Sequence, residues 1–398
     1  MTATDFSNST AIAYDYIPLK YEERRSFVET YGFAGSQGMV HVDAVLMRPA
    51  SGAPSDTVVV MMHPSVSQHI LPVPRALAER GLHVLCAQNR YFKNDSALIF
   101  EKALLDLGHC IRHAKEVLGY RHVVLIGWSG GGPLITYYQS QAEHPTVTQT
   151  PAGDPVDMAA AGLLPADAVI FQAASISRAR ILAEYIDPSV SDELAPEKRR
   201  LELDIYDPRN PNQPPYSADF IAAYRAAQLA RVRRITHWVK DTLDALRRRG
   251  GPETERAFNV HRTMADLRFL DLAIDPNDRT QGVSFIGNPE SANSGPAGFA
   301  RFCTLRSWLS QWSIDDSRAD AQQCVQGIGV PLLVIENGGD DGAPASHVRA
   351  VYEAARSSDK QMHRIAGANH YYARQPELLN QAVGITLGWM RERRLLAH

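Results

Sequence analysis

The chain has 398 residues, of which 44% are hydrophobic, and its 41 Lys and Arg against 44 Asp and Glu give a formal net charge of -3. These proportions are typical of a globular protein and exclude a disordered chain, a collagen-like repeat and a disulfide scaffold. The near-neutral charge lacks the basic signature of a nucleic-acid-binding protein, and no apolar run approaches the roughly 20 residues of a membrane span.

Strand-like and helix-like segments alternate along the first half of the chain. Residues 25–33 and 40–48 are β-rich, and a glycine-containing turn at 34–38 between them is typical of a hairpin. The pattern then predicts strands at 57–62, 82–88, 121–127 and 166–172, and helices at 72–80, at 97–118 and from 130 onward. Such repeated strand–helix–strand units predict a mostly parallel sheet with helices on both faces.

The alternation stops between residues 175 and 329. This stretch has no strongly apolar strand, and its main predicted element is a helix within 217–249. Strand character resumes at 330–336, and a helix at 346–357, a short strand at 361–365 and an amphipathic helix at 378–394 follow. We therefore predict a discontinuous core of residues 1–175 and 330–398, with residues 176–329 inserted after the sixth strand.

Residues 127–131, Gly-Trp-Ser-Gly-Gly, match the pattern G-x-S-x-G and lie between a predicted buried strand and a predicted helix. A nucleophile on such a sharp turn needs small neighbours, because its backbone is strained and glycine avoids the Cβ clashes. The helix that follows brings the partial positive charge of its first amides to the reaction centre. The motif predicts Ser129 as a nucleophile.

A nucleophilic serine needs a base, and the base needs an acid that orients it. In the chain order serine–acid–histidine, the acid follows a late strand. Asp340 is our preferred acid and Asp341 is the alternative, whereas Glu336 falls within the predicted strand. His370, in a glycine-containing loop before the last helix, is the predicted base, because its rival His363 falls inside a strand.

The negative charge of a tetrahedral intermediate needs amide donors. The backbone N–H of Gly130, directly after the nucleophile, is the first predicted donor. The second is expected from the loop after the strand at 57–62, where Pro64 has no N–H to offer. Ser65 is our preferred second donor and Val66 the alternative.

With these residues the chain resembles the α/β-hydrolase fold serine hydrolases, the broad group of esterases, lipases and C–C hydrolases. The resemblance rests on residues 127–131, Asp340, His370 and the pair His63-Pro64. It implies a mostly parallel eight-stranded sheet with a short antiparallel start, helices on both faces, and a largely helical cap domain formed by residues 176–329. One departure is that many members have His-Gly where this chain has His63-Pro64.

The insertion follows the carboxyl end of a strand, where open α/β sheets bind ligands. Trp308 and Trp312 within it are candidates to line a substrate pocket together with His63 and Trp128. The alternative for the two insertion tryptophans is an aromatic anchor between cap and core, and for Trp128 it is packing beneath the turn. Arginines at 231–234 and 247–249 are interpreted as a solvated helix face, because acidic residues accompany them.

We therefore predict a hydrolase without cofactor or metal that cleaves a carboxylic ester or lactone of a medium-sized, mostly apolar or aromatic small molecule through an acyl-enzyme. A C–C bond hydrolase or an acyltransferase with the same triad, and a non-catalytic binding scaffold, are the alternatives. The expected partner is the small-molecule substrate, with no nucleic acid or membrane, and a homodimer is the assembly to test.

The compartment is predicted from the N-terminus and the cysteines. Residues 1–8 lack the basic and apolar regions of a secretory signal. None of the four cysteines shows a metal-binding or CxxC spacing, and we interpret them as small buried hydrophobic residues. Both features favour a reducing, cytoplasmic location.

Overall fold

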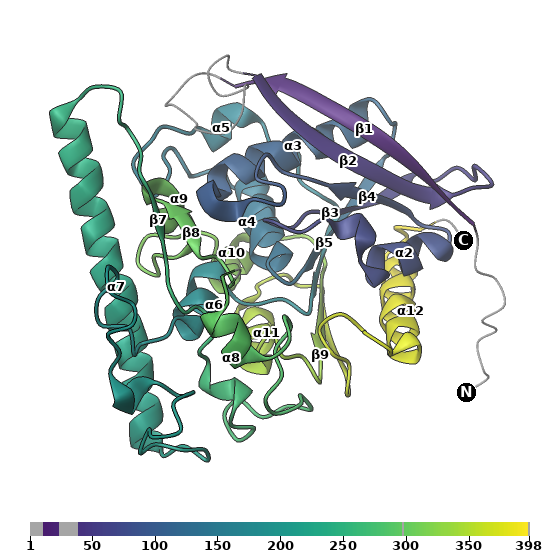
Figure 1. Cartoon of the computed structure of the whole chain (residues 1–398). Coiled ribbons are helices and arrows are strands. Elements are labelled where there is room, and N and C mark those ends of the chain that lie inside the picture. Colours follow the sequence, from purple (N-terminus) through teal and green to yellow (C-terminus); the bar gives the residue numbers. More distant parts are fainter. Residues whose placement is uncertain (1–10, 24–38, 297, 397–398) are drawn as a thin grey trace.

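The computed structural model describes residues 11–23, 39–296 and 298–396. Eight strands form one sheet in the order β1-β2-β4-β3-β5-β6-β9-β10 (Figure 1). The pairs β1·β2 and β2·β4 are antiparallel, and all other neighbours are parallel. The predicted mostly parallel sheet with an antiparallel start is confirmed.

The elements have the following bounds. The strands of the sheet are β1 (Ile12–Glu22), β2 (Met39–Pro49), β3 (Thr57–Met61), β4 (His83–Ala87), β5 (His122–Trp128), β6 (Ala168–Gln172), β9 (Leu332–Asn337) and β10 (Lys360–Ile365). The helices are α2 (Pro72–Glu79), α3 (Phe100–Glu116), α4 (Gly131–Glu143), α5 (Met158–Ala161), α6 (Arg178–Tyr185), α7 (Ala218–Arg249), α8 (Pro289–Ser294), α9 (Leu305–Gln311), α10 (Ala321–Cys324), α11 (Ala345–Ala354) and α12 (Pro376–Glu392).

The parallel strands bury side chains on both faces of the sheet. Val58 and Val60 of β3 belong to the apolar cluster that contains α3, α4 and α11. Val59 and Met61 belong to the opposite cluster with α2 and α12, because successive strand residues point to opposite faces. Every residue of β3, β4, β6 and β9 is buried, which explains the continuous apolar runs of these strands in the sequence.

The edge strand β1 was not predicted from the sequence. It pairs with β2 from Ile12 opposite Pro49 to Glu22 opposite Met39. Its residues alternate between partly buried and exposed, so it shows no apolar run, and Pro18 within it is tolerated because the strand is at the edge. The predicted strand at 25–33 and its turn at 34–38 lie outside the described residues.

The segment between β6 and β9 carries helices α6 to α10 and a small antiparallel pair, β7 (Ala257–Asn259) and β8 (Phe302–Thr304). Helix α7 runs along one side of the molecule (Figure 1), and three apolar clusters of its own stabilise the segment. Near its end, Ala319, Ala321 and Val325 instead pack with α3 and α4. The division at residues 176–329 remains a prediction, and this packing favours an earlier end of the inserted unit.

One arginine of α7 departs from the expected solvated face. Arg231 is 1% exposed and forms an ion pair with Glu193, with 2.6 Å between Nη2 and Oε2. Arg233 and Arg234 lie on the surface as predicted, and their carboxylate partners are Asp315 and Glu193. The arginines of α7 therefore bind the helix to its neighbours as well as forming a solvent-exposed face.

The four cysteines are buried and free, which confirms their interpretation as small buried hydrophobic residues. Burial raises the pKa of each thiol, so the thiols stay protonated and unreactive at neutral pH. Within the described part of the chain, no helix combines the length and apolar character needed to cross a membrane.

Candidate active site

Ser129 occupies the sharp turn between β5 and α4. Its φ is 55°, a left-handed conformation that costs a non-glycine residue on the order of 1–3 kcal/mol and occurs at functional sites. The neighbouring glycines allow the turn to fit. A Cβ on Gly127 would lie 2.6 Å from the Cα of Gly132, and one on Gly131 would lie 2.6 Å from the Met62 carbonyl oxygen. The sequence therefore forms the predicted strained turn that presents a serine.

Ser129, His370 and Asp340 form one hydrogen-bonded chain. The Oγ of Ser129 lies 3.0 Å from Nε2 of His370. The Nδ1 of the same ring lies 2.9 Å from both carboxylate oxygens of Asp340. His370 and Asp340 are each 2% exposed, so their contact is shielded from water. The structure thus joins three residues that are separated by 241 and 30 positions in the chain.

The loops that carry Asp340 and His370 hold each other in place. The amides of Gly342 and Ala343 donate to Oδ1 of Asp340 at 2.7 and 2.8 Å. The amide of Gly339 donates to the carbonyl of Ala368 in the histidine loop at 2.8 Å. These contacts orient the Asp340 carboxylate towards the imidazole of His370, so that its negative charge acts on the ring.

The two rival acids have other surroundings. Glu336 is 1% exposed and pairs with Arg349 and Arg364. Burial, and then the charge of Asp340, raises the pKa of Asp341 to about 6. Between the two aspartates, Asp340 is the one in contact with His370.

Comparisons with known proteins agree with this architecture. No family model matches the sequence, and no curated protein is similar to it. A soluble variant of monoglyceride lipase from Saccharomyces cerevisiae, solved with a substrate analogue, superposes with a TM-score of 0.50 and 11% identity over 100% of both chains. DcsB, solved with its substrate analogue, also gives 0.50, with 10% identity over 96% of this chain and 99% of that chain.

The chain has the α/β-hydrolase fold. Its strand order, the turn at Ser129 between β5 and α4, and full-length superposition on such a lipase are the observations that decide this. At these identities the likeness concerns the fold alone.

Within this fold the loop after β3 differs from the expectation for the oxyanion donors. The amide of Ser65 donates to Nδ1 of His63 at 3.1 Å, and the amide of Val66 donates to the same atom at 3.0 Å. Both predicted alternatives for the second donor are therefore directed at a side chain. The amide of Gly130 has no acceptor among the described residues, because it stands at the start of α4.

A cavity of about 60 Å³ is lined by Ser129, Gly130, His63 and His370. Its other walls are largely aromatic or aliphatic, formed by Trp128, Ile181, Tyr185, Phe285, Phe299 and Tyr371. The volume accommodates only about two water molecules, so a larger ligand requires these side chains to move. A larger cleft of about 930 Å³ beside α7 contains none of the triad residues.

The predicted pocket residues divide into two pairs. His63 and Trp128 line the cavity, and the indole N–H of Trp128 also donates to the His370 carbonyl at 3.1 Å. Trp308 and Trp312 do not line it. They are fully buried in the inserted segment, stacked at 5.0 Å between ring centroids. The prediction that they contact substrate is corrected, because their rings fill the apolar cluster beneath α7.

The surroundings of these tryptophans favour the other interpretation, an anchor. Ser307 of α9 donates to the Ser96 carbonyl, and the amide of Phe100 donates to Ser310 at 2.8 Å. Gln311 donates to the Asp95 carbonyl at 2.9 Å. Helix α9 thereby fixes the inserted segment to the start of α3.

The inserted segment also contacts the triad loops, which the sequence did not predict. The hydroxyl of Tyr185 donates to the Gly342 carbonyl at 3.0 Å, and the side chain of Asn277 donates to the Asp340 carbonyl at 2.7 Å. No local motif marks these residues, because their partners lie 157 and 63 positions away.

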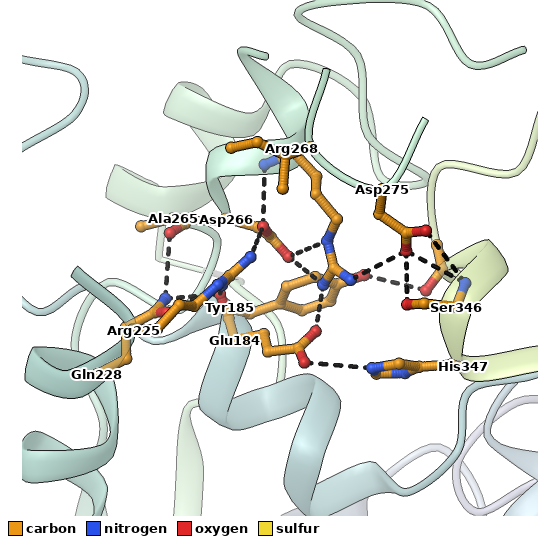
Figure 2. Close-up of polar contacts among 12 residues, drawn as sticks. Glu184, Tyr185, Arg225, Gln228, Ala265, Asp266, Arg268, Asp275, Ser346 and His347 are labelled. Carbon is orange, nitrogen blue, oxygen red and sulfur yellow. Dashed lines mark hydrogen bonds and ion pairs between the residues drawn. The ribbon is translucent and has the colours of Figure 1, made fainter. Parts of the chain in front are cut away.

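A charged network continues from Tyr185 (Figure 2). Glu184 lies between the guanidinium of Arg268 and the ring of His347 on α11, with 3.2 Å between Oε1 and Nε2 of the histidine. Asp266 accepts from Nε of Arg268 at 2.9 Å and from Arg225 at 2.8 Å. Burial opposes ionisation of Glu184, but the charges of Arg268, His347 and Arg225 and the contact with His347 together outweigh it and lower the pKa of the carboxyl. The network links α6, α7 and α11 beside the cavity.

Proposed function

We propose that this protein is a serine hydrolase that cleaves a carboxylic ester or lactone through an acyl-enzyme. The observation that carries the proposal is the continuous chain from Ser129 through His370 to Asp340, at 3.0 and 2.9 Å. This is the arrangement that activates a serine hydroxyl for nucleophilic attack. The fold, which also occurs in a lipase, supports the same reaction class.

In the proposed reaction, Ser129 Oγ attacks the carbonyl carbon while His370 Nε2 takes the hydroxyl proton. Asp340 accepts a hydrogen bond from Nδ1–H, which keeps Nε2 free to act as a base and stabilises the imidazolium. The tetrahedral intermediate collapses when the imidazolium gives its proton to the leaving oxygen. Water then attacks the acyl-enzyme by the same route, and Ser129 is regenerated.

The walls of the cavity indicate the kind of substrate. Phe285, Phe299 and Ile181 come from the inserted segment and Trp128 and Tyr371 from the core, and together they offer aromatic and aliphatic surface to a bound ligand. We propose a small, mostly apolar or aromatic substrate. A medium-sized one would enter after the phenylalanine side chains move. The cytoplasmic location and the homodimer stay predictions.

Two measurements test the proposal together. A fluorophosphonate should label Ser129, as located by peptide mass mapping, and short-chain nitrophenyl esters should be hydrolysed. Ser129→Ala should abolish both, while Ser65→Ala, whose side chain is outside the triad, should still be labelled. Labelling without ester cleavage would instead favour C–C bond hydrolysis or acyl transfer. Absence of labelling, with hydrolysis unchanged in Ser129→Ala, would reject the mechanism.

A further inference from the structure

The loop after β3 offers no free backbone donor at the positions where one is expected. Pro64 has no N–H, and the amides of Ser65 and Val66 both donate to Nδ1 of His63. The loop is held in this shape by Asn89, whose side-chain amide donates to the carbonyls of His63 and Pro64 at 3.0 and 3.1 Å. If the site stabilises an oxyanion with two donors, the second one must come from another group.

The hydrogen bonds to His63 determine which of its nitrogens carries the proton. Two N–H groups point at Nδ1, so this nitrogen is an acceptor and bears no hydrogen. In a neutral imidazole the other nitrogen must then be protonated. Burial, reinforced by the nearby charges of Arg178 and His370, lowers the pKa of His63 to about 3. The ring is therefore neutral at physiological pH, with its proton on Nε2.

The protonated nitrogen lies at the nucleophile turn. A Cβ built on Gly130 would be 3.0 Å from Nε2 of His63, so this nitrogen lies beside the residue that supplies the first oxyanion donor. His63 lines the same cavity as Ser129 and Gly130. Nε2 has no acceptor among the residues that the structure describes, and its N–H is therefore available to a ligand.

We infer that the side chain of His63 is an oxyanion donor, with Nε2–H taking the place of the loop amide and acting together with the N–H of Gly130. The inference rests on the proposed function. As Ser129 Oγ bonds to the carbonyl carbon, the π electron pair moves to the carbonyl oxygen, and both N–H groups donate to that oxygen. The proton of His63 stays on Nε2 throughout, because Nδ1 is occupied and cannot exchange roles with it.

This arrangement explains the presence of Pro64 directly after His63. A proline at this position removes an amide and fixes φ near −65°, and the two amides after it turn towards the ring. The loop thus has one backbone donor fewer, and the imidazole N–H of His63, oriented towards the reacting atoms, replaces it. A neutral imidazole donor also adds no further positive charge to a cavity that Arg178 already lines.

Two substitutions separate this role from a merely structural one. In His63→Asn, the side-chain oxygen can accept from the amides of Ser65 and Val66, but nothing reaches the position of Nε2. In His63→Gln, the side-chain amide can donate near the position of Nε2, but the loop loses its acceptor. For an oxyanion donor we expect His63→Asn to lower kcat on a nitrophenyl ester about 100-fold or more, with KM within threefold, and His63→Gln to retain more activity than His63→Asn.

The reverse order of activity, or a kcat for His63→Asn within threefold of the wild type, would overturn the inference. A trifluoromethyl ketone provides a second readout, since its adduct with Ser129 carries an oxyanion. Its affinity should fall in His63→Asn by the same factor as kcat.

The position of the His63 proton can also be measured in the wild-type protein, so this test does not depend on whether a variant folds. Nitrogen-15 NMR of histidine-labelled protein should show His63 protonated on Nε2 and bare on Nδ1, and a ring protonated on Nδ1 would overturn the inference. The outcome is separable from that of the proposed function. A wild type that neither labels nor hydrolyses esters rejects both, whereas a Ser129-dependent hydrolase with a fully active His63→Asn rejects only the role of His63.

Discussion

The sheet and the segment inserted after β6 bury different kinds of side chain. The parallel strands fill both faces of the sheet with valine, leucine and isoleucine. In the inserted segment, arginines form ion pairs in which at least one partner is buried, as in Arg231 with Glu193, Arg262 with Asp187 and Asp204, and Arg268 with Asp266. In the described core, a comparable pair, Arg90 with Asp106, lies off the sheet near β1.

This difference has a consequence for the site. Apolar packing is non-directional. It supports the loops of Ser129, Asp340 and His370 because the strands of the core bury apolar surface. Charged hydrogen bonds are directional, and in the inserted segment they fix the orientation of the pocket walls rather than adding net stability. We therefore expect changes in the core loops to affect the chemical step, and changes in the inserted segment to affect substrate binding and the free energy of unfolding.

The largest effect is expected at the acid. Asp340→Asn should lower kcat by about 10⁴-fold, because an amide stabilises the wrong tautomer of the base, as in other serine triads. Asp341→Asn is the matched control and should keep kcat within about fivefold. Because its pKa is raised from 3.8 to about 6, Asp341 destabilises the folded state progressively as the pH rises between these values and fully above pH 6, so Asp341→Asn should be more stable at pH 8 by up to about 3 kcal/mol. Equal small losses of kcat in both variants would contradict the assignment.

Breaking the buried network of the inserted segment should cost more stability than breaking a partly exposed ion pair. Asp266→Asn removes the common partner of Arg225 and Arg268 and should lower the free energy of unfolding by about 3 kcal/mol, the lower end of the range for breaking a buried ion pair, since Arg268 keeps Glu184 as a counter-charge. The control is Asp15→Asn, which breaks a partly exposed pair with Arg48 on β1 and β2 and should cost at most about 1 kcal/mol. Urea unfolding measures both. Equal costs would remove the distinction between the two regions.

Substrate binding should respond to the aromatic wall. Phe285 lies with its ring centroid 5.8 Å from that of His370, and Phe285→Ala should raise KM for an aromatic ester about 10- to 100-fold, from the loss of about 1.5–3 kcal/mol of apolar contact. The turnover number should change less than threefold. Trp308→Phe, which alters an equally apolar residue that does not line the cavity, should leave KM unchanged. A change of KM in Trp308→Phe would instead support the original prediction that Trp308 lines the substrate pocket.

The last effect concerns the acid stability of the His63 site. With a folded-state pKa near 3 and an ordinary unfolded value near 6.5, the unfolded chain binds one more proton between these limits. Stability should therefore fall on acidification from pH 6.5 towards 4, by up to about 1.4 kcal/mol per pH unit from this group. In His63→Asn this contribution should disappear, giving a shallower slope of unfolding free energy against pH. Identical slopes in the two proteins would show that folding does not lower the pKa of His63.

Local patterns were sufficient to predict most of the sheet and the three side chains that the structure brings into contact at the turn after β5. Continuous apolar runs locate β3 and β5, and the order of Ser129, Asp340 and His370 follows from the turn and from the late strands. The edge strand β1 was missed because its side chains alternate in exposure. The tryptophan prediction failed because aromatic composition does not reveal which side of a helix meets a cavity. The role of Tyr185 depends on a contact 157 positions away.

The orientation of the His63 ring could not be read from the sequence either. A histidine before proline indicates a loop, but whether the ring accepts from the next two amides depends on backbone angles that no spacing encodes. In the folded loop, the contacts of the Ser65 and Val66 amides to Nδ1 of His63, at 3.1 and 3.0 Å, assign the ring proton to Nε2.

The central claim is that Ser129 is acylated during turnover, and peptide mass spectrometry of the quenched enzyme tests it most directly. The wild type is mixed with a slowly deacylating nitrophenyl ester, quenched in acid within the first turnover, and digested for peptide mapping. We expect the mass of the acyl group on the peptide that contains Ser129, and none in Ser129→Ala. Rapid hydrolysis without any adduct, or an adduct on another residue that persists in Ser129→Ala, would contradict the account.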